Sequence, residues 1–201
     1  MTGVIIGVES TAHTFSFGLV TEEGIPRKSY SALYRPEEGG IHPREAADHH
    51  SNLASELISR LIEEENIVSN DVRAIAFSQG PGLGPCLRIG ANVSRALSEK
   101  WEIPLVGVNH CVAHIEIGRN QTGCIDPVLL YVSGGNTQVI ARAGDRYQVL
   151  GETLDIGIGN MLDKFARTQG LAFPGGPKIE QLAREWHELN PEADVDLVEL
   201  P

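Results

Sequence analysis

Two histidines four residues apart, His110 and His114 in the segment HCVAH, have a spacing that could serve chemistry. On a helix this spacing places both imidazoles on one face, one turn apart, as a metal site requires. Asn109 precedes them and is a favourable N-cap, which supports the helix. The alternative is a pair of polar residues on a partly buried face. Cys111 follows His110, so the general base of an HExxH zinc protease is missing.

A second candidate is the segment YVSGGNTQ, residues 131–138. Tyr131 and Ser133 point to the same face of a strand, and Tyr131 could bring its phenol oxygen to a metal or a substrate. The two glycines after Ser133 let the backbone approach a ligand closely, and consecutive N–H groups can cup a phosphate. An ordinary hairpin turn is the alternative interpretation.

Three weaker signals complete the set. The glycine-rich loop 79–84 leads into a helix and suits anions, although it is not a Walker loop and could be a tight connection. Asp163 and the segment GGPKIE, residues 175–180, could hold a ribose and the edge of an adenine, or be routine helix features. A histidine cluster near residues 42–50 is interpreted as partly exposed side chains without a ligand; its members are His42, His49 and His50.

The elements that position these residues follow from hydrophobic periodicity and turn signals. Strands are expected at 3–9, 14–20, 27–33, 72–77, 104–108, 128–132, 137–142 and 147–152. Helices are expected at 43–65, 86–100, 110–117, 160–169 and 178–189.

The pattern starts again after the turn-like segment QTGCIDP (121–127), because an apolar strand, a second strand and a glycine hairpin recur in the same order. This echo predicts an α/β protein with the duplicated actin-like ATPase and sugar-kinase fold, which holds a nucleotide between its halves. We expect a first domain at 1–118 and the N-terminal part of a second at 119–201, the remainder being absent. Glu9, which ends the first strand, stands where this fold commonly places an acidic residue facing the phosphates, and is the catalytic candidate.

Composition limits the function classes. The 201 residues carry a net charge of −11, which argues against strong autonomous binding of nucleic acid. No apolar run approaches the roughly 20 residues that span a bilayer. Three cysteines without a CxxC motif favour a reducing cytosol over a disulfide scaffold.

Seven segments together resemble the tRNA N6-adenosine threonylcarbamoyltransferase family, in particular its archaeal and eukaryotic branch, which belongs to the KEOPS complex. They are GVESTAHT (7–14), GIHPREAADHH (40–50), SQGPGLGPCLRIG (78–90), VNHCVAH (108–114), YVSGGNTQ (131–138), LDKFAR (162–167) and PGGP (174–177). They occur in the family's order over nearly the whole chain. AHT, rather than the bacterial-type CDET, favours the archaeal and eukaryotic branch.

The resemblance implies that one iron or zinc ion is bound by His110, His114 and Tyr131. It also implies adenylate contacts from Tyr131, Val132, Ser133, Gly134, Gly135, Asp163, Gly176 and Glu180. An Asn and a metal-binding Asp that the family uses near its C-terminus have no counterpart in this sequence.

The implied reaction transfers threonylcarbamoyl from threonylcarbamoyl-AMP to N6 of the adenosine 3′ of the anticodon, in tRNAs that read codons beginning with A. The expected partners are tRNA and KEOPS subunits, including a small protein kinase-like one, in the cytoplasm. The chain alone is expected to be inactive. Alternatives are the metallopeptidase of the older glycoprotease description, an inactive scaffold, and a sugar kinase or ATPase.

Overall fold

A computed structural model describes residues 3–36 and 40–192 of the chain. It divides into two compact units, Met1–Pro127 and Val128–Pro201, and each is described by itself. The structure thus groups residues 119–127 with the first unit. None of the helices in the described residues combines the length and the apolar character needed to cross a membrane.

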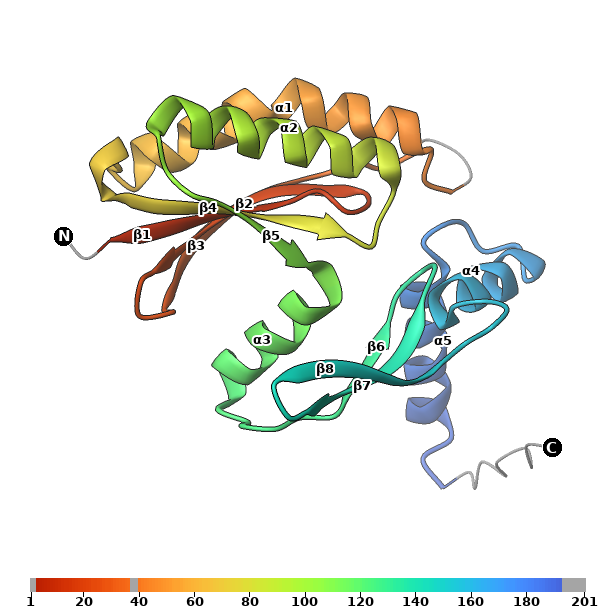
Figure 1. The fold of residues 1–201 in the computed structure, drawn as a ribbon. Coiled ribbons are helices and arrows are strands. Elements are labelled where there is room, and N and C mark those ends of the chain that lie inside the picture. The colour runs from red at the N-terminus through yellow and green to blue at the C-terminus, as the bar shows by residue number, and fades with distance from the viewer. Residues whose placement is uncertain (1–2, 37–39, 193–201) are drawn as a thin grey trace. The chain divides into compact units, whose positions relative to one another are not determined.

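The first unit is built on a five-stranded mixed sheet with the strand order β3-β2-β1-β4-β5 (Figure 1). Its strands are β1 (Val4–Glu9), β2 (Thr14–Thr21), β3 (Pro26–Leu33), β4 (Val72–Gly80) and β5 (Leu105–Asn109). The first three pair antiparallel, whereas β4 pairs parallel with β1 and β5 pairs parallel with β4. Because β1, β4 and β5 run the same way, their carboxyl ends, which carry Glu9, Ser78 and Asn109, meet at one edge of the sheet.

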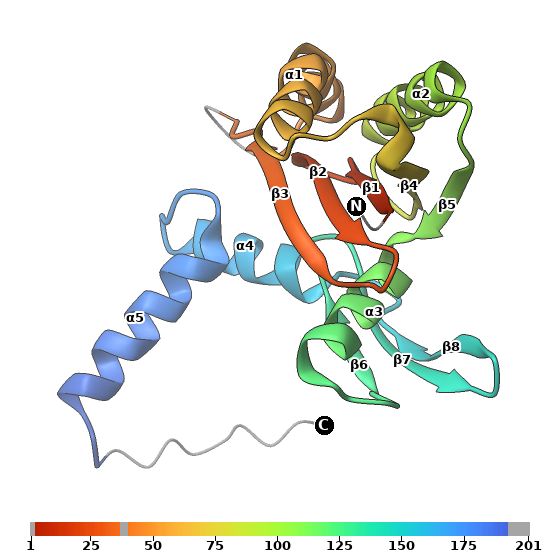
Figure 2. The same ribbon diagram turned by 90° about the vertical axis from the view of Figure 1, so that its left-hand side faces the viewer.

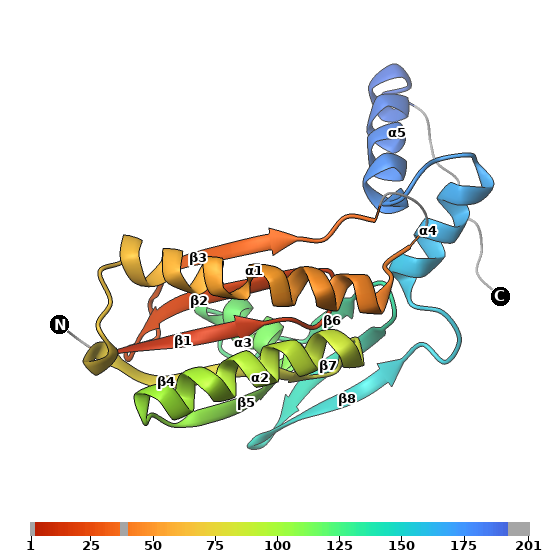
Figure 3. The same ribbon diagram turned by 90° about the horizontal axis from the view of Figure 1, so that it is seen from above.

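Helices α1 (Pro43–Glu64) and α2 (Gly84–Trp101) lie side by side on one face of this sheet (Figure 3). Alternate residues of β1 and β2 face them, since side chains along a strand alternate between its two faces. The buried core on this face includes Ile6, Phe15, Phe17, Leu61 and Ile75. Pro43 occupies the first turn of α1, where a missing N–H costs nothing.

Helix α3 (His110–Thr122) follows β5 without a linker and lies on the other side of the sheet (Figure 2). The second unit has a separate antiparallel sheet, β6 (Leu129–Val132), β7 (Thr137–Ala143) and β8 (Arg146–Glu152), in the order β6-β7-β8. Two helices follow that pack on each other, α4 (Ile158–Thr168) and α5 (Gly175–Leu189).

The expected strands and helices are all present, with shifted ends. Strand β4 continues to Gly80, and α3 continues to Thr122. Helix α5 begins at Gly175, inside the PGGP segment that the sequence predicts as a loop. The first and sixth strands lie in separate sheets, as expected from the repeated pattern.

Candidate metal and nucleotide-binding sites

The two histidines of HCVAH lie on the first and second turns of α3 and face each other. Strand β5 ends at Asn109, whose side chain accepts hydrogen bonds from the N–H groups of Cys111 and Val112, at 2.9 and 3.2 Å. The expected N-cap is therefore confirmed. The Nε2 atoms of His110 and His114 lie 3.2 Å apart, and the two rings are nearly perpendicular.

Glu9 reaches this histidine pair from the end of β1. Its Oε2 lies 3.0 Å from Nδ1 of His110 and accepts a hydrogen bond from the Ser78 hydroxyl, while its Oε1 accepts the N–H of Thr11 at 2.6 Å. Burial disfavours its charged form, but the hydrogen bonds from His110, Ser78 and Thr11 outweigh this and lower the pKa of Glu9 to about 2. The lowered pKa favours the ionised carboxylate, and both of its oxygens accept hydrogen bonds from the protein.

The histidine pair fits a metal ion. Ligand bonds from imidazole to zinc are about 2 Å long, so two nitrogens 3.2 Å apart can share one ion. Partial burial and the neighbouring His110 lower the pKa of His114, which favours the neutral form that a ligand must have. Within residues 3–36 and 40–192, no group of three or more His, Cys, Asp or Glu side chains is placed to hold an ion. His110 and His114 are therefore the two candidate ligands in the described part of the first unit.

Tyr131 belongs to the second unit, so its place beside the histidines stays a prediction. It lies in β6 and is 9% exposed. Val132, the next residue, is exposed.

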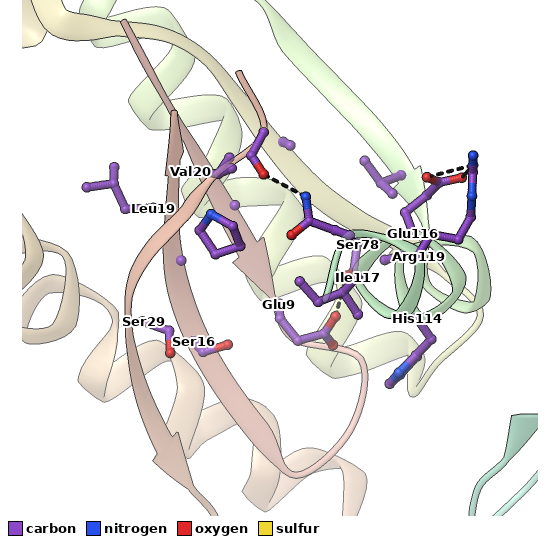
Figure 4. A pocket seen from close by; sticks show the side chains of 18 of the residues that line it. Glu9, Ser16, Leu19, Val20, Ser29, Ser78, His114, Glu116, Ile117 and Arg119 are labelled. Carbon is purple, nitrogen blue, oxygen red and sulfur yellow. Dashed lines mark hydrogen bonds and ion pairs between the residues drawn. The ribbon is translucent and has the colours of Figure 1, made fainter. Parts of the chain in front are cut away.

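A cavity of about 1070 Å³ opens beside the histidines, between the sheet face and α3 (Figure 4). Glu9, Ser78 and His114 line it together with Glu116 and Arg119 of α3, which pair with each other at 3.0 Å. The sheet contributes a floor that is partly bare backbone, since the lining residues Gly7 and Gly18 are directly paired on β1 and β2.

In the second unit, the turn after β6 is bound to the start of α4. The N–H groups of Gly159 and Asn160 donate to the carbonyls of Ser133 and Gly134, at 3.0 and 3.1 Å. The N–H of Asn136 donates a hydrogen bond to the Ser133 hydroxyl, which closes the turn. Among the described residues, no protein acceptor receives the N–H groups of Gly134 and Gly135. The carbonyl side of the turn is thus bound to α4, whereas these two N–H groups have no protein acceptor in the described part of the chain.

The loop before α5 is bound to α4 in a similar way. Oδ1 of Asp163 accepts a hydrogen bond from the N–H of Gly175 at 2.7 Å. One carboxylate oxygen of Asp163, which is predicted to contact the nucleotide, is therefore bound to the protein. A Cβ atom on Gly175 would lie 2.4 Å from Cβ of Ala166, whereas one on Gly176 would meet nothing nearer than 4.0 Å. Gly175 is therefore required by packing, whereas Gly176 would accept a Cβ atom without a close contact.

The predicted residues of the second unit form one connected group: the turn contacts the first turn of α4, and Asp163 of α4 holds the loop with Gly176. Glu180 stands one turn further along α5, exposed and paired with Arg184 at 2.5 Å. In the first unit the structure brings Glu9, His110 and His114 together.

Sequence reasoning did not predict the roles of two residues in the first unit, and it misjudged the exposure of a third. Ser78 and Thr11 both bind Glu9, and the position of Ser78 near the end of a strand parallel to β1 was the available signal. The interpretation of the 42–50 histidines as partly exposed is wrong for His50. That side chain is 0% exposed, stacks on Phe15 and lies 2.9 Å from the Ala12 carbonyl.

The mixed sheet, the repeated three-strand pattern and the glycine turn define an actin-like α/β protein. Two solved structures confirm this fold class. EutJ from Carboxydothermus hydrogenoformans is similar with a TM-score of 0.54 and 15% identity over 98% of this chain and 75% of that one. YeaZ from Pseudomonas aeruginosa is similar with a TM-score of 0.52 and 16% identity over 76% of this chain and 66% of that one.

The chain belongs to the tRNA N6-adenosine threonylcarbamoyltransferase family, whose sequence model matches residues 27–198. A relative named tRNA N6-adenosine threonylcarbamoyltransferase, from Archaeoglobus fulgidus, is 58% identical over 182 residues. That match covers 90% of this chain and 55% of the relative. The chain therefore spans about half the length of this relative.

Proposed function

We propose that this chain forms the metal-binding and adenylate-binding part of an enzyme that makes threonylcarbamoyladenosine in tRNA. The donor is threonylcarbamoyl-AMP, and the acceptor is N6 of the adenosine 3′ of the anticodon in tRNAs that read codons beginning with A. The proposal is supported by membership of the family and by one geometric observation above all. The Nε2 atoms of His110 and His114 face each other at 3.2 Å, as ligands of one ion do.

His110 and His114, with Tyr131, would hold one iron or zinc ion, since imidazole and oxygen ligands suit both metals. The ion would act as a Lewis acid that polarises the donor and stabilises the charge that develops on it. In the second unit the N–H groups of Gly134 and Gly135 would bind the phosphate of the adenylate. Asp163, Gly176 and Glu180 would hold its ribose and adenine.

The reaction depends on positioning because an exocyclic adenine amine is a poor nucleophile. N6 attacks the carbamoyl carbon, the bond from that carbon to the phosphate oxygen breaks, AMP leaves with the electron pair, and the amine loses a proton. Donors that are already fixed in place, such as the turn bound to α4, cost no reorganisation when this charge shifts.

Partner subunits would supply most of the binding affinity for tRNA. With a net charge of −11, this chain gives little electrostatic attraction to phosphate. The partners we propose are the KEOPS subunits, among them a small protein kinase-like one. We place the activity in the cytoplasm, in keeping with three cysteines that form no CxxC motif in the sequence.

A chimera tests the proposal. This chain replaces the matching segment of the Archaeoglobus fulgidus relative, and the product is assayed with threonylcarbamoyl-AMP, tRNA and partner subunits by mass spectrometry of the digested tRNA. We expect threonylcarbamoyladenosine from the chimera, and none above background from its His110→Ala variant. A matched control, His42→Ala, changes an exposed histidine of the same unit and should retain activity.

The 201-residue chain alone should produce no modified nucleoside in the same assay. An active His110→Ala chimera would contradict the role of the metal. Cleaved peptide or ADP as the product would favour a peptidase or a kinase. No observation favours the peptidase, since Cys111 stands where its general base belongs.

A further inference from the structure

The contacts of Glu9 form a directed chain of hydrogen bonds. A carboxylate only accepts hydrogen bonds, so each of its three neighbours must donate. The N–H of Thr11 donates to Oε1 at 2.6 Å, and the Ser78 hydroxyl donates to Oε2. Nδ1 of His110, 3.0 Å from Oε2, must therefore carry a hydrogen.

The hydrogen on Nδ1 determines what the other nitrogen of the ring can do. A neutral imidazole carries one hydrogen, so Nε2 of His110 has a lone pair. That lone pair faces Nε2 of His114 at 3.2 Å. Without an ion, His114 satisfies it by donating from its own Nε2, and the chain of donors then runs from His114 through His110 to Glu9.

We propose that Glu9, braced by Ser78 and Thr11, is a positioning residue that keeps His110 in the tautomer whose Nε2 is ready to bind the metal. The inference rests on the proposed function for the existence of the metal, but the tautomer can be measured without it. A carboxylate that hydrogen-bonds to a metal-binding histidine typically changes metal affinity by about 10- to 100-fold.

A single isosteric substitution should reverse the direction of the hydrogen bonds that link Glu9, His110 and His114. In Glu9→Gln the backbone N–H of Thr11 still requires an acceptor, so the amide oxygen stays at the Oε1 position. The amide NH₂ then takes the Oε2 position and donates toward Nδ1 of His110. His110 must move its hydrogen to Nε2, which blocks the metal-binding lone pair, and His114 must become the acceptor.

Two further variants separate this effect from general disturbance. Ser78→Ala removes a donor but leaves an acceptor-only carboxylate, so it should preserve the tautomer of His110. Glu116→Gln makes the same change of charge on α3, in the same cavity, where the carboxylate pairs with Arg119. It should leave both tautomers unchanged.

The experiment uses the 201-residue chain, selectively labelled with ¹⁵N-histidine, and long-range ¹H–¹⁵N spectra in the absence of metal. Zn²⁺ alone is then titrated by calorimetry. We expect hydrogen on Nδ1 of His110 and on Nε2 of His114 in the wild type and in Glu116→Gln, and the reverse in Glu9→Gln. Zinc affinity should fall about 10- to 100-fold in Glu9→Gln and less than tenfold in Ser78→Ala.

The proposal is overturned if wild-type His110 carries its hydrogen on Nε2, a result that needs no variant to fold. It is also overturned if Glu9→Gln keeps the wild-type tautomers and zinc affinity, or if Glu116→Gln loses as much affinity. Wild-type tautomers as expected, without zinc binding, would support the positioning role and count against the metal centre of the proposed function.

Discussion

His50 is a buried histidine whose surroundings favour its neutral form. It lies in α1, fully buried, with Nε2 2.9 Å from the Ala12 carbonyl and its ring stacked on Phe15. Burial lowers the pKa of His50, and the neighbouring His49 and His13 act in the same direction, while the Ala12 carbonyl and Glu9 oppose it. A proton on this ring is therefore tolerated less well in the folded protein than in the unfolded chain.

The first unit should lose stability as the pH falls below 6.5. Since the folded pKa of His50 lies below the unfolded value of 6.5, its contribution is complete above pH 6.5 and is lost at lower pH, by at most about 1.4 kcal/mol per pH unit. Urea unfolding at pH 7.5, 6.5 and 5.5 measures the slope. His50→Gln should reduce it, whereas the exposed His42→Gln should not. An unchanged slope in His50→Gln would contradict this assignment.

The sequence predicts that His110 and His114 lie together, because a four-residue spacing places two side chains on the same face of a helix without any long-range contact. It could not predict the partner of that pair. Glu9 and His110 are 101 residues apart, and they meet only because β1, β4 and β5 lie parallel and in that order. Strand order depends on packing of the whole unit, which no local pattern encodes.

Helix α3 depends on its cap for the geometry of its first turn. Asn109 satisfies two of the N–H groups that a helix leaves unpaired, and His110 follows it directly, with His114 one turn further on. Asn109→Ala should cost about 1 kcal/mol of stability and weaken zinc binding by loosening the His110–His114 pair. Asn109→Asp, which can still cap, should retain both properties. Equal zinc affinity in the Ala and Asp variants would show that the cap does not position the histidines.

Helix α4 depends on Gly159, which lets the turn after β6 approach its first turn closely. A Cβ on Gly159 would lie 2.7 Å from the Ser133 carbonyl oxygen, whereas one on Gly135 would meet nothing within 4 Å. Gly159→Ala should therefore destabilise the second unit by about 1–3 kcal/mol. Gly135→Ala should leave stability unchanged and weaken the binding of AMP, measured by calorimetry. The opposite pattern, with Gly135→Ala the less stable variant, would contradict the assigned roles.

Elements are predicted well where periodicity is strong and less well where a long-range contact decides an end. Helix α5 starts at Gly175 because Asp163, twelve residues earlier, accepts its N–H. Pro174–Pro177 looks like a loop when only local propensity is considered. The burial of His50 was missed for the same kind of reason, since its partner, the Ala12 carbonyl, comes from the β1–β2 connection.

At the scale of the whole molecule, the second unit carries many exposed apolar side chains. Leu130 and Val132 on β6 are 62% and 45% exposed, and β6 is an edge strand. Helix α5 exposes Trp186 and Leu189. Apolar edge strands pair readily with other chains.

We expect the isolated chain to self-associate as its concentration rises. A lysine on the edge strand should oppose this, so Leu130→Lys should lower the apparent mass in sedimentation velocity at high concentration. Ile25→Lys is the matched control, because Ile25 is 61% exposed but lies in the turn between β2 and β3. If both variants act alike, net charge rather than the strand edge governs association.

Gly7 and Gly18 are paired on the floor of the first unit's cavity. The lack of side chains at these positions makes the strands less stable but enlarges the cavity. A methyl group would find no atom within 4 Å at Gly18 and would lie 3.9 Å from the nearest one at Gly7, so the fold itself has room for alanine at both. Glycine inside a strand costs about 0.5–1 kcal/mol relative to alanine. Gly18→Ala should therefore raise the melting temperature while narrowing the hollow by one methyl group. Alanine substitutions at these two positions therefore test how closely a substrate or a neighbouring segment approaches the backbone. If one must come within a methyl group of the strands, the added methyl should reduce function.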